Sequence, residues 1–332
     1  MKGSGKWKDK EIEQIMGLET SGVEHAVLSM ALAPDEQWIA AVTVSGPVHF
    51  FGDNHKAIFN PVGLGDDTVG TTCLRFSPIM DEGRYTMLAT LSSGRVSQFK
   101  VKVNAEYVTM NSFVEADNEV MVGEYATDGL SFATGGSDKV VRLYDSRTMQ
   151  MSLAFTEGID HHGQSTLAHH NRIFAIKFLS PNTFISAGWE SSMLLFDSRA
   201  STNAQRSFAG PRVSGDSLSL LGSFTVGAAS DRTENQLQLF DLRSKGDEAF
   251  QSVTVGSRLF ALRLQNNKDT NHVEAWACGN NDNAVVVVDM TTGLEIAAVR
   301  GVPGSLFALE HSAQQDCLLF GGSRNSVFKI SL

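Results

Sequence analysis

Asp216 is the residue whose type and position first suggest chemistry. It lies in VSGDSL (213–218), where the matching stretch of an internal repeat has the aliphatic Ile176. A carboxylate at such a position is either a ligand or catalytic group facing a central channel, or an acid satisfied by backbone amides or by Lys177 or Arg263. Because buried acids are usually paired, we favour the second interpretation.

A second group of side chains that could bind a metal is a cluster of histidines that precedes Asp216 in the sequence. These are His161, His162, His169 and His170. Four imidazoles without cysteine or acid at set spacing are a weak metal signal, so we expect a solvated loop with one structural histidine, His169. The chain also lacks a P-loop, a Gly-x-Ser-x-Gly elbow, His-Glu-x-x-His and Cys-x-x-Cys. We therefore expect no metal, no cofactor and no enzymatic activity.

The elements that position these residues are repeated strands. Three segments alternate apolar residues and end in aromatic-Asp-x-Arg: VVRLYDSR (140–147), MLLFDSR (193–199) and LQLFDLR (237–243). Such a period of two indicates strands. Weaker copies are AVVVVDM (284–290), SVFKISL (326–332), PVHFFGDN (47–54) and GRVSQFK (94–100), which makes seven units.

The spacing of the repeat predicts the fold. The aligned positions are Gly52, Lys100, Asp145, Asp197, Asp241, Asp289 and Ser331, which lie 42 to 52 residues apart. Units of this length with four strands each are typical of β-propeller blades. We predict an all-β chain forming one seven-bladed β-propeller of four-stranded antiparallel blades over residues 23–332.

The two ends of the chain should meet in the last blade. Its unit supplies three strands, near 305–311, 316–321 and 326–331, and then the chain ends. We expect EIEQIM (11–16), within an N-terminal arm of residues 1–22, to be the missing outer strand.

The pattern resembles the WD-repeat family over residues 23–332. In place of the Trp-Asp pair the chain has Tyr144-Asp145, Phe196-Asp197, Phe240-Asp241 and Val288-Asp289. Acids seven residues earlier match the family's turn between the second and third strands: Asp138, Glu190, Glu234 and Asp282. The resemblance also implies a hydrogen-bonded network of His169, Ser186 and Glu190. It implies a rigid ring that presents loops to protein partners.

The aromatic-Asp-x-Arg boxes end at Arg147, Arg199 and Arg243. They are similar to the docking box of WD-repeat substrate receptors of cullin-RING ubiquitin ligases, so binding to a ligase adaptor is one hypothesis. The alternative, which we favour, is that each aspartate caps its turn while the arginine packs on the next blade.

A further candidate surface is aromatic. Trp189 is placed in a turn beside the channel mouth, with His170 and Arg172 as its polar rim, and an exposed tryptophan is a common hot spot. Packing within the turn is an equally good interpretation. Phe174, Phe260 and Phe307 recur at one site of the repeat. We expect them to be core, or else aromatic anchors around the channel mouth for a peptide or helix.

Composition limits the classes of partner. The 332 residues carry a net charge of −10, which argues against nucleic acid, and no apolar run is long enough to insert into a membrane. Three widely spaced cysteines and no secretory signal indicate the cytoplasm, with nuclear or cytoskeletal association left open. The leading hypothesis is a non-enzymatic, monomeric scaffold that binds other proteins or peptides, including within a multiprotein complex. The alternatives are the ligase receptor and a channel-centred enzyme at Asp216.

Overall fold

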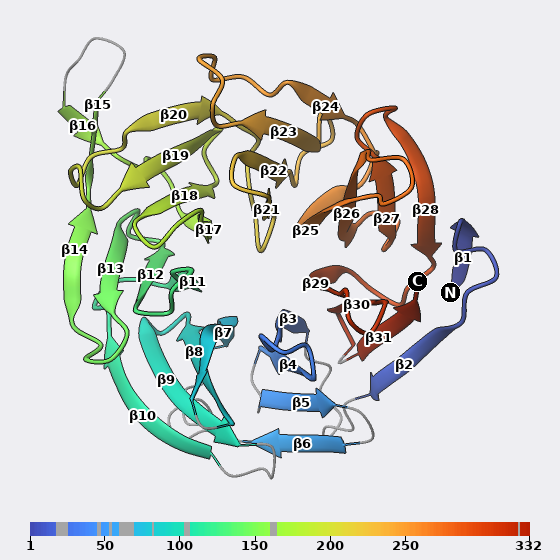
Figure 1. The fold of residues 1–332 in the computed structure, drawn as a ribbon, viewed down its shortest axis with the longest axis horizontal. Helices are drawn as coiled ribbons and strands as arrows, with labels where there is room; N and C mark the ends of the chain where they lie inside the picture. Colours follow the sequence, from blue (N-terminus) through green and yellow to red (C-terminus); the bar gives the residue numbers. More distant parts are fainter. Residues whose placement is uncertain are drawn as a thin grey trace. The chain divides into compact units, whose positions relative to one another are not determined.

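The computed structural model describes residues 1–17, 26–44, 48–52, 55–59, 70–81, 83–102, 107–159, 165–324 and 326–332. These residues form two compact units. One consists of Leu28–Glu190 and Leu194–Ser207, and the other of Met1–Val27, Ser191–Met193 and Phe208–Leu332. All the regular elements of the described residues are β-strands (Figure 1). The predicted boundary between arm and propeller, at residues 22 and 23, lies outside the described residues.

The first unit holds four four-stranded antiparallel sheets, which are blades one to four in chain order. Blade one has β3 (Val27–Leu32), β4 (Trp38–Thr43), β5 (Val48–Gly52) and β6 (His55–Phe59). Blade two has β7 (Thr71–Asp81), β8 (Arg84–Leu91), β9 (Arg95–Lys102) and β10 (Tyr107–Val114). Blade three has β11 (Val120–Tyr125), β12 (Ser131–Gly136), β13 (Val141–Asp145) and β14 (Met151–Phe155). Blade four has β17 (Ile173–Phe178), β18 (Thr183–Gly188), β19 (Ser192–Asp197) and β20 (Arg206–Ala209), preceded by a hairpin of β15 (Glu157–Ile159) and β16 (Ser165–Leu167).

The second unit holds blades five to seven. Blade five has β21 (Leu218–Leu221), β22 (Thr225–Ala229), β23 (Leu237–Asp241) and β24 (Gln251–Val253). Blade six has β25 (Arg258–Asn266), β26 (Val273–Asn280), β27 (Val285–Asp289) and β28 (Leu294–Arg300), and blade seven has β29 (Leu306–Ser312), β30 (Cys317–Gly322) and β31 (Ser326–Ser331).

The N-terminal segment completes both of these last two blades. β2 (Ile12–Gly17) pairs antiparallel with β31, with Ile12 opposite Ile330, as Figure 1 shows near the C-terminus. This confirms the predicted closing strand. β1 (Lys2–Gly5) adds a fifth strand to blade six beside β28, which the repeat did not predict.

A repeated aromatic position on the third strand fills the interior of the blades. Its members are all buried: Phe51, Phe99, Tyr144, Phe196 and Phe240. Alternation along the strand points every second residue to the same face, so one aromatic per repeat builds equivalent packing in each blade. Burial of each such ring contributes roughly 1.5–3 kcal/mol of transfer free energy.

His49 on β5 should make folding stability depend on pH. Burial lowers the pKa of His49 to about 4, and its Nε2 has no hydrogen-bond partner among the described residues. Between the ordinary pKa of 6.5 and this value the unfolded chain binds the proton and the folded chain does not. Stability should therefore fall as the pH drops through this window, by up to about 1.4 kcal/mol per pH unit. Urea unfolding at pH 7 and pH 5 of the wild type and of His49→Phe checks this. The difference should shrink in the variant, and an equal difference would contradict it.

Candidate functional site

Trp189 follows β18 and is held in place while part of its ring stays in solvent. Its backbone N–H donates to the carbonyl of Arg172 at 3.0 Å. Its ring lies 5.0 Å from the ring of Phe174, and the Arg172 guanidinium lies 5.9 Å from its centroid. The residue is nevertheless 37% exposed. Trp189 thus packs within its turn on one side and presents a fixed apolar surface on the other.

A buried histidine network fixes this turn. His169 is 1% exposed, and its Nε2 lies 2.6 Å from Ser186 Oγ. Its Nδ1 contacts the Glu190 carboxylate, which also accepts the backbone N–H of His170 at 2.8 Å. The network predicted for His169, Ser186 and Glu190 is therefore present. Because it holds Glu190 inward, the neighbouring Trp189 has a defined orientation.

Of the expected polar rim, Arg172 has its guanidinium 5.9 Å from the Trp189 ring, and the backbone N–H of His170 donates to Glu190. His170 is exposed, and Arg172 is partly exposed and forms an ion pair with Glu119 of the preceding blade. We call Trp189, His170, Arg172 and Phe174 the Trp189 surface. It combines an aromatic centre with groups that can exchange hydrogen bonds at the edge, which is the usual composition of a protein-binding hot spot.

The three repeated phenylalanines are not enclosed in the core. Phe174, Phe260 and Phe307 are each only partly buried, so the expectation that they are core residues is corrected. Each follows the first buried residue of its blade's first strand, where a shift in register marks a β-bulge. In the second unit the rings of Phe260 and Phe307 lie 5.4 Å apart. They form an aromatic pair that solvent reaches.

The aspartates of the aromatic-Asp-x-Arg boxes cap their turns, as expected. Asp145 Oδ1 accepts the backbone N–H of Arg147 at 3.1 Å and of Thr148 at 2.7 Å. Asp197 and Asp241 likewise accept the backbone N–H groups of the arginines two residues later. Such local bonds explain why the motif recurs with the turn.

The arginines behave differently from the favoured interpretation. Arg199 and Arg243 do not pack on the next blade but each forms a two-point ion pair with its own aspartate, and their side chains are 66% and 65% exposed. The hydrogen bonds from Arg243 lower the pKa of Asp241 to about 2. Arg243 also lies 5.1 Å from the ring of Phe224 in its own blade. Arg147 is exposed.

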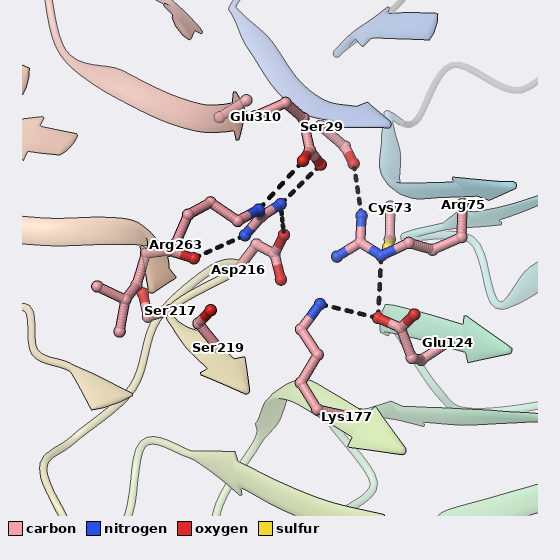
Figure 2. A network of polar contacts seen from close by, with 12 residues as sticks. Ser29, Cys73, Arg75, Glu124, Lys177, Asp216, Ser217, Ser219, Arg263 and Glu310 are labelled. Atoms are coloured by element: carbon pink, nitrogen blue, oxygen red, sulfur yellow. Dashed lines mark hydrogen bonds and ion pairs between the residues drawn. The ribbon is translucent and has the colours of Figure 1, made fainter. Parts of the chain in front are cut away.

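Asp216 forms an ion pair with Arg263, one of the partners that the favoured interpretation offered. Its Oδ2 lies 2.7 Å from Arg263 Nη2, and the same nitrogen lies 2.6 Å from Glu310 Oε1 (Figure 2). The three side chains are 14–19% exposed. A carboxylate held by an arginine that also holds a second acid is part of an ion-pair network, so the arrangement favours a structural role.

The first unit contains an ion-pair network of the opposite composition. Glu124 Oε2 lies 3.0 Å from both Arg75 Nε and Lys177 Nζ (Figure 2). One acid thus joins two cations here, whereas Arg263 joins two acids in the second unit. Arg75, Glu124, Lys177, Arg263 and Glu310 all lie on the first strands of their blades.

No group of three or more metal-binding side chains occurs among the residues that the structure describes. His161 and His162 lie outside them. Cys73, Cys278 and Cys317 are buried and form no disulfide, and burial raises the pKa of Cys278 far above its ordinary value. A thiol held protonated in this way is a poor nucleophile. In the described part of the chain, no helix is long and apolar enough to cross a membrane.

Sequence reasoning missed a buried acid in blade three. One carboxylate oxygen of Glu115 accepts hydrogen bonds from Thr134 Oγ1 at 2.6 Å and from the Tyr144 hydroxyl at 2.9 Å. Its other oxygen accepts Asn118 Nδ2 at 2.6 Å and Arg142 Nη1 at 3.0 Å. Burial, followed by the charge of Glu115, raises the pKa of Tyr144. The signal was present, since Glu115 lies 19 residues before Thr134, close to the 17 between His169 and Ser186.

A second feature that the sequence did not predict is the set of side-chain contacts that hold the N-terminal arm against blade six. Lys6 Nζ lies 3.0 Å from Glu274 Oε1, and Trp276 Nε1 donates to the same carboxylate at 2.8 Å. Burial would raise the pKa of Glu274, but hydrogen bonds from Asn267, Trp276 and Lys6 outweigh it and lower the pKa. Trp7 is 1% exposed and its ring lies 5.9 Å from that of Trp276.

Comparison with known proteins extends these observations. No family model and no curated protein matches the sequence. Among solved structures, the WD40 beta propeller domain of Doa1 is similar with a TM-score of 0.70 at 13% identity, covering 96% of this chain and 97% of that chain. At this identity the likeness establishes the fold alone. The chain is an all-β, seven-bladed β-propeller, with a WD40 propeller as its structural neighbour.

Proposed function

We propose that the protein is a non-enzymatic scaffold that binds protein or peptide partners at the Trp189 surface. The observation that carries the proposal is the partly exposed indole of Trp189, which is already fixed by Phe174, Arg172 and the turn below it. A preformed aromatic anchor loses little conformational entropy on binding, so it can contribute a large share of the affinity.

The two alternatives have less support. A ligase adaptor would need the guanidinium groups of Arg199 and Arg243, and both are engaged by their own aspartates. An enzyme at Asp216 would need an available carboxylate, and Arg263 engages it. The class of partner, protein or peptide, stays a prediction. So do the monomeric state and the cytoplasmic location.

Truncation of Trp189 should weaken partner binding and leave the fold intact. Hot-spot truncation typically costs about 2 kcal/mol or more, or roughly thirtyfold in affinity. Partners would be identified by proximity crosslinking and mass spectrometry, and the best one purified for titration against the wild type and Trp189→Ala. The melting temperature should change by only a few degrees.

Phe250→Ala is the matched control, because Phe250 is an aromatic residue that is 60% exposed and lies outside the Trp189 surface. It should bind the partner like the wild type. Equal affinity of Trp189→Ala and the wild type would overturn the surface assignment, and a large drop in melting temperature would assign Trp189 to the core.

A further inference from the structure

Eight arginines of the described residues lie against carboxylates. The paired ones are Arg75, Arg142, Arg172, Arg199, Arg212, Arg243, Arg263 and Arg300. Within the described part of the chain, neither Arg232 nor Arg258 has a carboxylate at ion-pair distance. The same is true of Arg84 and Arg147, but Arg232 and Arg258 lie together at one hollow. Both are exposed, and they lie at the same place on the second unit. In an acidic protein such an unneutralised pair needs an explanation.

These two arginines line a hollow of about 320 Å³ together with Arg212, Asp231 and Thr233. Arg212 precedes β21, residues 231–233 lie in the turn between β22 and β23, and Arg258 begins β25. The hollow is therefore built at the turn of blade five that corresponds to the turn of Trp189 in blade four.

The one acid of the hollow is already used to hold an arginine. Asp231 Oδ1 lies 3.3 Å from Arg212 Nε, and its other oxygen accepts Ser214 Oγ at 2.9 Å. Arg212 is 34% exposed and Asp231 15%, so this pair forms the half-buried floor. The lining thus carries three guanidinium groups against one carboxylate. An entering anion would relieve the repulsion among these cations.

We propose that this hollow binds a phosphorylated side chain of a protein partner. Guanidinium groups match the oxygens of phosphate with paired hydrogen bonds, and a dianion balances the excess of two positive charges. A nucleic acid or an anionic membrane would need a continuous basic surface, which a chain of net charge −10 does not favour. The inference rests on the proposed function for the source of the ligand, but it uses different residues.

The test uses the full-length protein and three fluorescent peptide libraries of equal length with random flanks. Their fixed central residue is phosphoserine, serine or glutamate, and binding is measured by fluorescence anisotropy. We expect the phosphoserine library to bind at least about tenfold more tightly than the other two, since hydrogen bonds between charged groups are the strong ones. Inorganic phosphate should compete for the site.

The decisive variant is Arg232→Gln combined with Arg258→Gln, which should weaken phosphopeptide binding by about thirtyfold or more. The matched control, Arg84→Gln with Arg300→Gln, removes the same charge from exposed residues elsewhere and should bind within about twofold of the wild type. Neither pair is buried, so both variants should fold.

Each other outcome would overturn the proposal. No binding, or equal binding of the phosphoserine and serine libraries, would exclude a phosphate site. Equal binding of the glutamate library would assign the hollow to acidic side chains, and displacement of the peptide by transfer RNA or phosphatidylserine vesicles at equal affinity would assign it to polyanions. Trp189→Ala should leave phosphopeptide binding unchanged, so failure here and failure of the Trp189 surface can be told apart.

Discussion

Deletion of residues 1–17 should lower the melting temperature by on the order of 10 °C, because it removes three kinds of contact at once. β2 closes the edge of blade seven and β1 covers the edge of blade six. Trp7 fills a buried site against Trp276, and loss of a buried tryptophan alone typically costs about 3–5 kcal/mol. Calorimetry of the full chain and the deletion variant measures the effect.

Shorter variants separate these contributions. Deletion of residues 1–10 removes β1 and Trp7 but leaves β2, so it should account for about half of the loss. The control is Lys8→Ala with Asp9→Ala, two exposed residues of the intervening turn, which should melt like the wild type. A 1–17 deletion that melts within about 2 °C of the full chain would show that both strands are dispensable.

The closing strand β2 was predictable and β1 was not, for a physical reason. A blade needs four strands, so the missing one in blade seven had to come from the other end of the chain. β1 is a fifth strand on a complete blade, and no count of strands requires it. Its position depends on Trp7 and Lys6, which have no counterparts in the repeat.

The candidate sites likewise include features that the repeat predicts and features that it does not. The partners of His169 could be predicted, and Arg263 was one of three partners proposed for Asp216, because equivalent positions of a repeat lie on neighbouring strands or in one blade. The pairing of Arg199 and Arg243 with their own aspartates depends on side-chain rotamers in solvent, which the repeat does not specify. The hollow of Arg212, Arg232 and Arg258 depends on how two loops meet the start of β25.

The two ion-pair networks differ in their ratio of acids to cations. Their contributions to the free energy of unfolding can therefore be measured separately. Arg263 bridges Asp216 and Glu310, so its loss removes an ion pair from each of two partly buried carboxylates. Lys177 shares Glu124 with Arg75, so its loss leaves one complete ion pair. The same kind of substitution should therefore have unequal costs in the two networks.

Arg263→Met should destabilise the fold by about 3 kcal/mol, because removal of one partner from a buried ion pair leaves uncompensated charge. Lys177→Met should cost about 1 kcal/mol or less, since Glu124 keeps Arg75 at 3.0 Å. Urea unfolding of the two variants measures the difference.

The decisive comparison adds Asp216→Asn and Glu310→Gln to Arg263→Met. These amides keep the shape of the acids and remove their charge, so the triple variant should recover most of the lost stability. If the triple variant is no more stable than Arg263→Met, packing of the arginine side chain rather than charge balance holds these strands together.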